Sequence, residues 1–164
     1  MPTVKAALDP YRNWTDPHED VGANPFRLVS TVESRATIDE ISRAWPAHVL
    51  LPQLESLWLS SREAWLFQDI DFGQWGLHIL DPSAAAARTN AERARRPADF
   101  EATDAVVGEF LGDTDVLVLE SNGGVLVALP LDPRTDWPRV ASTLREVLGE
   151  LIPFWPRIVR PAFD

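Results

Sequence analysis

Two pairs of aspartates could bring carboxylates close enough together for acid–base or metal chemistry. Asp69 and Asp71 form one Asp-x-Asp pair, and Asp113 and Asp115 form another. Two such pairs at adjacent strand ends could assemble a site of the kind that holds divalent metal ions. Aspartate is also common in turns, where its side chain bonds to the nearby backbone, and a chain with 25 acidic residues acquires such pairs by chance. We therefore favour solvated turn residues over a metal-dependent enzyme.

Other residue types that carry chemistry do not form a motif. The histidines His18, His48 and His78 lie far apart and show none of the spacings typical of a metal site. No serine stands in a Gly-x-Ser-x-Gly setting, and the chain has no cysteine. Gly123-Gly124 lacks the surrounding pattern of a phosphate-binding loop. We expect no catalytic residues, no metal and no cofactor.

The chain is acidic, and its charge is unevenly distributed. With 15 basic and 25 acidic residues the net charge is −10, which disfavours direct binding of nucleic acid because a phosphate backbone repels an anionic protein. Residues 99–128 contain no lysine or arginine and seven acidic side chains: Asp99, Glu101, Asp104, Glu109, Asp113, Asp115 and Glu120. This segment is either a solvated sheet face or an anionic docking surface that attracts a basic protein.

Seven tryptophans also stand out in a chain of 164 residues. Trp65 and Trp75 flank the Asp69–Asp71 segment and could be interface anchors, since tryptophan is enriched among residues that dominate binding energy. The candidate partner-binding residues are therefore Asp69, Asp71, Trp75, Glu109, Asp113, Asp115 and Glu120.

Short helices and strands must position these residues. Thr37-Ile38-Asp39-Glu40 predicts a capping box and a helix that ends at Pro46, and Leu51-Pro52 predicts the start of a second helix. A third helix is predicted at 84–96; because its apolar residues are almost all alanine, we expect it to lie weakly anchored at the surface. The first two helices are expected to precede the sheet.

Strands are predicted at 64–67, 76–80 and 106–111. The sequence around Asn122-Gly123 predicts a β-hairpin, because both flanks are apolar and β-branched. Apolar residues at helical spacing predict a closing helix over 137–151 that covers the sheet. Helices on either side of adjacent short strands, without β-α-β alternation, predict an α+β domain with an antiparallel sheet.

Residues 1–33 are predicted to form an extended N-terminal arm, because they contain four prolines and polar segments. Trp14 and Phe26 could hold this arm against a single domain spanning 34–164. The first residues include no apolar stretch of signal-peptide length, and no apolar run is long enough to cross a bilayer. We expect a cytoplasmic protein with no membrane contact.

The order of these features resembles the SMI1/KNR4 (SUKH) superfamily over residues 34–152. The features that carry the resemblance are the helix 38–45, the Leu51-Pro52 opening, the strand 76–80, the segment 108–113 leading into the strand 116–119, and the helix 137–152. One departure is the glycine-free stretch 60–63, where the family often has an Asn-Gly-Gly-like turn. The resemblance implies an α+β fold without catalytic residues.

In bacterial members, the resemblance further implies a cytoplasmic immunity protein that binds and neutralises a cognate polymorphic toxin, often a nuclease or deaminase. The acidic charge agrees with a basic toxin domain as partner. The alternative is a general regulatory or scaffolding module with several weak partners.

Overall fold

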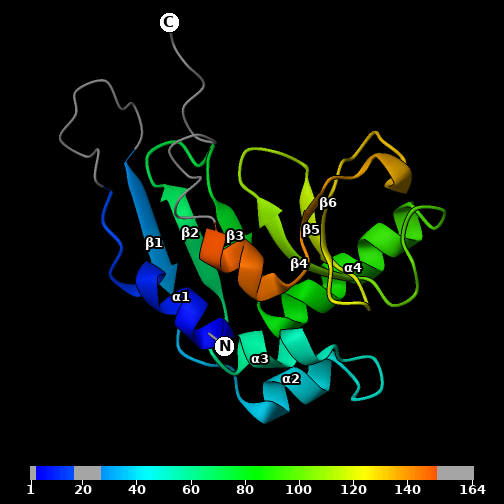
Figure 1. Cartoon of the computed structure of the whole chain (residues 1–164), viewed down its shortest axis with the longest axis horizontal. Helices are drawn as coiled ribbons and strands as arrows, with labels where there is room; N and C mark the ends of the chain where they lie inside the picture. The colour runs from blue at the N-terminus through cyan, green and yellow to red at the C-terminus, as the bar shows by residue number, and fades with distance from the viewer. Residues whose placement is uncertain (1–2, 17–26, 151–164) are drawn as a thin grey trace, which may run out of the picture.

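The computed structural model describes residues 3–16 and 27–150 and contains one seven-stranded sheet (Figure 1). Each strand pairs antiparallel with the next strand along the chain, so the spatial order is the chain order. The strands are β1 Leu28–Val32, β2 Ala64–Asp69, β3 Leu77–Ile79, β4 Ala105–Phe110, β5 Val116–Leu119, β6 Val125–Ala128 and β7 Arg139–Ala141. The predicted α+β class with an antiparallel sheet is confirmed.

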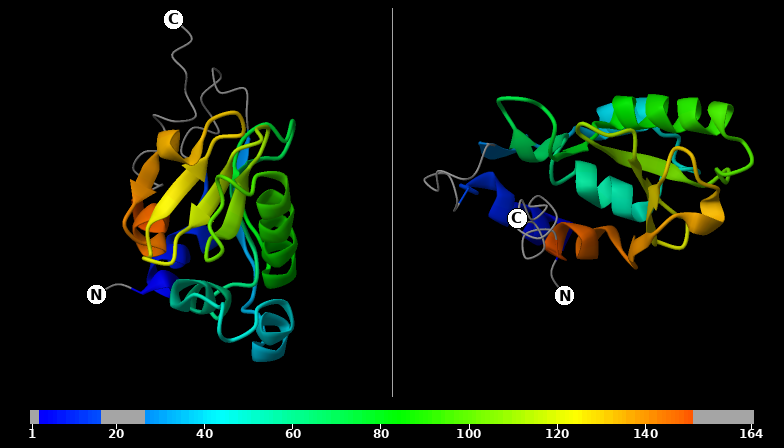
Figure 2. Two further views of the ribbon diagram at one scale, coloured as in Figure 1. Left: turned by 90° about the vertical axis from the view of Figure 1, so that its right-hand side faces the viewer. Right: turned by 90° about the horizontal axis from the view of Figure 1, so that it is seen from above.

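Helices cover both faces of this sheet (Figure 2). α1 (Val4–Arg12) and the helical residues 144–150 lie on one side, which we call the α1 face. α4 (Pro82–Arg95) lies on the other, the α4 face, with α2 (Ile38–Ala44) beside it. α3 (Pro52–Trp58) packs at one end of the sheet next to α1, and a short 3-10 turn, η1 (Arg134–Asp136), precedes β7. None of the helices in the described ranges is both long and apolar enough to cross a membrane.

Local sequence signals explain where α2 and α3 begin. The Thr37 hydroxyl accepts a hydrogen bond from the Glu40 N–H (3.1 Å), and the Glu40 carboxylate accepts one from the Thr37 N–H (2.7 Å), which is the predicted capping box. Pro52 occupies the first turn of α3, where its missing N–H costs nothing. Both predictions are confirmed.

The predicted hairpin is confirmed as β5 and β6. The turn between the strands is closed by hydrogen bonds from the Glu120 N–H to the Gly124 carbonyl (2.8 Å) and from the Gly123 N–H to the Glu120 carbonyl (2.9 Å). Gly123 has a φ of 93°, in the region that glycine adopts without strain. The Asn122 side chain accepts the Gly124 N–H (2.8 Å), so the asparagine stabilises the turn through its side chain.

The prediction of an arm without regular structure over residues 1–33 is wrong for the described part of that segment. The Thr3 hydroxyl caps α1 by accepting the Ala6 N–H (3.1 Å), and Leu8 and Tyr11 are completely buried in the core. β1 forms an edge of the sheet ahead of α2 and α3, so those helices do not precede the whole sheet. Phe26 lies outside the described residues.

The closing helix begins at residue 144, later than the predicted start at 137. Trp137 is buried outside any helix, and 139–141 pair with β6 as β7, which gives the β6 backbone a second partner. The helix begins at 144 because the Thr143 hydroxyl accepts the Glu146 N–H (3.1 Å) and the Glu146 carboxylate accepts the Ser142 N–H (2.7 Å). The residues beyond 150 lie outside the described part.

α4 is more firmly anchored than its alanine-rich sequence predicts. The Thr89 hydroxyl donates to the Ala85 carbonyl (2.7 Å) and accepts the Val106 N–H of β4 (2.8 Å), so one buried side chain joins the helix to the sheet. Small alanine side chains allow this close approach of the helix to the strand. Glu92, also buried, is held by Arg88 (3.3 Å) and Arg95 (2.6 Å).

The described ends of the chain meet on the α1 face, and this contact can be tested. The buried Tyr11 hydroxyl donates a hydrogen bond to the Leu148 carbonyl. Replacing Tyr11 with Phe leaves that carbonyl without its donor, so we expect the free energy of unfolding to fall by about 1–3 kcal/mol in urea titrations. Lys5→Gln, at a side chain that is 68% exposed, should change it by less than about 0.5 kcal/mol. Equal stability of Tyr11→Phe and the unaltered protein would contradict this role of α1.

Candidate functional site

A groove of about 600 Å³ lies on the α1 face, between the loop that joins β2 to β3 and the loop that joins β4 to β5. Its volume is in the range of about 300–1,000 Å³ that is usual for ligand-binding pockets. Apolar side chains from four strands form its floor: Phe67, Leu77, Phe110 and Val127. The rim includes Gln74 and Trp75 from the first loop and Leu111, Asp113 and Asp115 from the second.

Asp69 shapes the β2–β3 loop from the inside. Its carboxylate accepts hydrogen bonds from the N–H groups of Asp71 (3.0 Å), Phe72 (3.1 Å) and Gln74 (3.3 Å), and the residue is only 1% exposed. A carboxylate engaged in this way has no free surface to offer to a partner. The prediction that Asp69 binds a partner directly is therefore replaced by a structural role beneath Trp75.

The two loops are held against each other at a glycine. The Leu111 N–H donates to the Gly76 carbonyl (2.9 Å), which ties the loops together. Gly112 has a φ of 77°, and a Cβ atom at this position would lie 2.2 Å from the Gln74 carbonyl oxygen. Only glycine fits such an approach, so Gly112 determines the distance between the two sides of the groove.

Phe67 forms part of the floor through an irregularity in β2. Its φ of 55° is unusual for a bulky residue, and the pairing of β1 with β2 shifts register at this point. The Phe67 N–H donates to the Ser30 hydroxyl (3.0 Å) in place of a ladder hydrogen bond. The Phe67 ring packs edge-on against Tyr11 and Trp14, with ring centroids 5.5 Å and 4.9 Å apart. The floor is therefore continuous with the core under α1. Trp14 thus holds the chain against the domain, as predicted.

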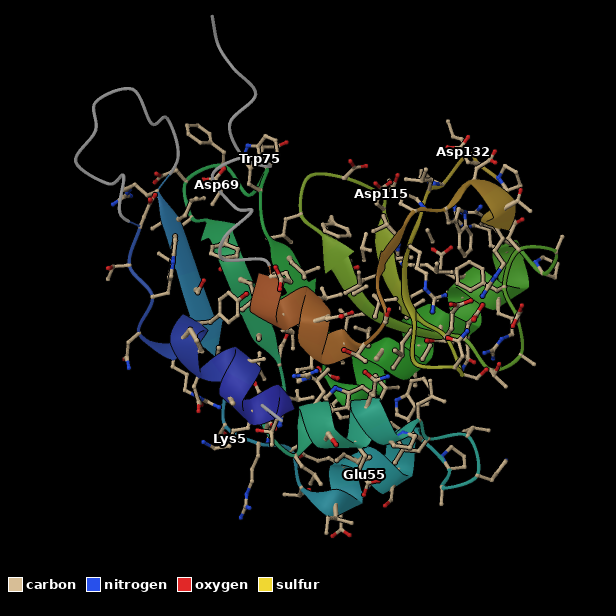
Figure 3. The ribbon with its side chains drawn as sticks, viewed as in Figure 1. Lys5, Glu55, Asp69, Trp75, Asp115 and Asp132 are labelled. Atoms are coloured by element: carbon tan, nitrogen blue, oxygen red, sulfur yellow. The ribbon has the colours of Figure 1, made fainter. Side chains whose placement is uncertain are left out.

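Negative charge is concentrated at one side of the groove. Asp113 and Asp115 lie on its rim, and Asp132 lies beside them at the same edge of the sheet (Figure 3). Within the described residues, none of these three carboxylates forms an ion pair. Partial burial raises the pKa of Asp115, and the neighbouring carboxylates Asp113 and Asp132 raise it further. The groove therefore combines an apolar floor with mutually repelling charges.

The other predicted acidic residues are used within the protein. Asp71 pairs with Arg27, whose guanidinium lies 2.6 Å away and lowers the pKa of the Asp71 carboxyl. Glu109 lies on the α4 face, where it contacts His78 Nδ1 (3.3 Å) and Arg88 (3.4 Å). His78 Nε2 is 2.5 Å from Glu63, and its ring stacks on Trp65 with centroids 3.5 Å apart. Glu109, His78 and Glu63 therefore contact one another away from the groove, and none of them lines it.

Arg134 neutralises much of the acidic segment 99–128. Its guanidinium forms hydrogen bonds with both oxygens of Asp104, a carboxylate with no exposed side-chain surface, and also with Glu120 (3.0 Å). Glu120 is shared with Arg139 (2.7 Å). Glu101 lies 3.8 Å from Arg134, and Asp99 pairs with Arg96 (3.1 Å). The segment is therefore not a continuous anionic surface, because of its seven acidic residues only Asp113 and Asp115 lack a basic partner within the described chain.

The two Asp-x-Asp pairs do not assemble one carboxylate site. Asp69 ends β2, whereas Asp115 precedes β5, and β3 and β4 lie between them. Figure 3 shows the two residues well apart along the same edge. Over the described residues, no group of three or more histidine or acidic side chains is arranged to hold a metal ion.

A second hollow, of about 270 Å³, lies between residues 45–51 and α4. Two of its polar side chains are used within the fold: Thr89 bonds to β4, and Arg93 Nη2 donates to the carbonyls of Ala102 and Asp104 (both 3.0 Å). The groove, with its unpaired carboxylates, is the better candidate for binding.

The structure thus joins Trp75, Asp113 and Asp115 of the predicted set around one groove with an apolar floor, and it places Asp132 beside Asp115 without making it part of the groove lining. Sequence reasoning missed Asp132 because it follows β6, outside the acidic segment. The positive φ of Phe67 has no sequence signal either, because the residue is neither glycine nor asparagine.

In comparisons with known proteins, the chain matches no protein-family model and no curated protein.

The role of Arg134 can be tested through stability. Arg134→Met leaves the buried Asp104 carboxylate without its counter-charge, so we expect the free energy of unfolding to fall by about 3 kcal/mol in urea titrations. Adding Asp104→Asn should recover part of that loss, because the double variant buries no unpaired charge. Arg139→Met is the control: this side chain is 48% exposed, and its loss should matter little. A double variant less stable than Arg134→Met alone would refute the charge argument.

The raised pKa of Asp115 predicts a pH-dependent effect on stability. The folded protein holds the Asp115 proton more tightly than the unfolded chain, so ionisation at neutral pH costs folding free energy, and this cost disappears as the pH falls below the ordinary pKa of 3.8. Asp115→Asn should therefore stabilise the protein at pH 7 by up to about 0.5 kcal/mol and should give no gain near pH 3. Urea unfolding across this range measures the difference. Asp136→Asn, at an exposed position, is the matched control; a gain that persists at low pH would contradict the assignment.

Proposed function

We propose that this protein is an immunity protein that binds a cognate toxin domain of basic charge and neutralises it by direct contact. The observation that carries the proposal is the groove, where an apolar floor lies beside three carboxylates that have no basic partner in the described chain. Buried apolar anchors beside charged groups are typical of protein interfaces. The resemblance to bacterial SMI1/KNR4 proteins supports the same function.

The charge of the whole chain supports a basic partner. A net charge of −10 attracts a cationic domain over long range and raises the rate of association. The same charge repels nucleic acid, so this chain would not compete for the substrate of a nucleic-acid-cleaving toxin. It would instead block such a toxin by binding the toxin's own cationic surface. The proposal assigns no catalytic step to this chain and takes the cytoplasm of the producing cell as the place of action.

The proposal predicts one dominant partner and protection of cells that contain it. The tagged protein, recovered from its host at low salt, should carry a large protein with a basic C-terminal domain, and high salt should release it because exposed charge pairs are screened. Expression of that domain alone should be toxic, and co-expression with this chain should restore growth. The purified domain should also lose its activity when this chain is added.

Two controls make the outcome decisive. An Asp113→Asn/Asp115→Asn variant should protect less well at equal expression, whereas Asp39→Asn, exposed on α2 at the opposite end of the molecule, should protect fully (Figure 1). Recovery of many proteins in similar amounts, with no protection, would reject immunity in favour of a regulatory or scaffolding module.

A further inference from the structure

The apolar side chains and the carboxylates of the groove indicate which residue types a binding partner must present to it. Phe110, Leu111 and Val127 are only partly buried and present apolar surface in the groove, and removing such surface from water is favourable by roughly 25 cal/mol per Å². The exposed Phe72 lies on the same β2–β3 loop as Trp75. The occupant must therefore bring a large apolar side chain of its own.

The rim adds a requirement for positive charge next to that apolar side chain. Asp113 and Asp115 are two residues apart on one loop, Asp132 lies beside Asp115 (Figure 3), and both Asp113 and Asp132 disfavour ionisation of Asp115. A cation placed among them would relieve this repulsion. Guanidinium suits the position better than ammonium, because its planar fork can donate to two carboxylate oxygens at once.

We propose that the groove receives a partner segment in which an aromatic side chain stands next to an arginine, with the aromatic ring on the partly exposed side chains of Phe110 and Val127 and the guanidinium between Asp113 and Asp115. This inference rests on the proposed function, since it names the element by which the toxin domain is held. Such a segment would contribute the two residue types that most often dominate protein interfaces.

Charge argues against the other occupants. A second copy of this chain also carries a net charge of −10, so its approach to an acidic rim is repelled. Nucleic acid is excluded from the rim for the same reason. A neutral apolar segment would fill the floor but would leave three carboxylates crowded together without a counter-charge.

Capped dipeptides test this proposal on the full chain without knowledge of the toxin. The probe is acetyl-Phe-Arg-amide, and the matched controls are acetyl-Phe-Gln-amide and acetyl-Ser-Arg-amide. In ¹H–¹⁵N NMR titrations, the Phe-Arg probe should shift the Trp75 indole signal and the Gly76 and Gly112 amide signals. Each control should bind at least about fivefold more weakly, since it lacks one of the two contacts.

Variants and salt separate specific docking from general attraction. Asp113→Asn and Asp115→Asn should each weaken the Phe-Arg probe by about fivefold, and Asp39→Asn should leave it unchanged. Raising NaCl from about 0.05 to about 0.5 M should weaken Phe-Arg more than Phe-Gln. Equal binding of Phe-Arg and Phe-Gln, or no shift at the groove signals, overturns the proposal.

The other possible occupants give distinct results. Groove signals that move when the protein alone is diluted would identify a second copy as occupant and overturn the proposal. Groove signals that respond to no probe in the full chain overturn it as well.

The same experiments distinguish this inference from the proposed function. Phe-Arg binding in a protein that fails to protect cells supports the groove assignment and rejects immunity. Full protection by the Asp113→Asn/Asp115→Asn variant supports immunity and rejects the groove as the contact surface.

Discussion

The Arg134 guanidinium determines where negative charge remains on this protein. It lies against the ring of Trp137 (5.5 Å) and binds a fully buried carboxylate, that of Asp104, together with Glu120. A buried carboxylate is tolerated only when it is paired and hydrogen-bonded. By neutralising one end of β4 and β5, this residue allows the acidic segment to be part of a folded sheet. The uncompensated charge is then confined to the opposite ends of the same strands, at Asp113 and Asp115.

Much of the fold could be predicted from the sequence, because the predicted elements depend on local chemistry. The capping box at Thr37 and the turn at Gly123 each act through neighbours a few residues away, and both are found as expected. The regular apolar period from Trp137 does not locate the start of the closing helix, which depends on the hydrogen bonds of the Thr143 and Glu146 side chains to the backbone of its first turn. The conformation of residues 139–141 depends on long-range pairing, because these residues pair with the edge of β6 as β7.

The candidate site was only partly predictable for a related reason. Acidic residues can be counted from the sequence, but whether a carboxylate is free depends on which arginine folds back onto it. Glu109 and Glu120 have basic partners 21 and 19 residues away, on elements that only the tertiary structure brings close. Asp69 was predicted to bind a partner, but its carboxylate accepts hydrogen bonds from three backbone N–H groups and supports the loop. The floor of the groove includes Phe67, whose positive φ could not be predicted, because phenylalanine rarely adopts this conformation.

The agreement between strand order and chain order bears on how this molecule assembles and opens. The pairs β2–β3, β4–β5, β5–β6 and β6–β7 form between strands close in sequence, which favours rapid folding, whereas β1–β2 and β3–β4 are joined by connections that contain α2 with α3 and α4. The contact between Tyr11 and Leu148 is different, because it spans 137 residues and must wait until the sheet exists. We therefore regard the α1 region as the last part to dock and the first to detach. Because Tyr11 packs on Phe67, such a detachment would reach the floor of the groove while the hairpin of β5 and β6 stays intact.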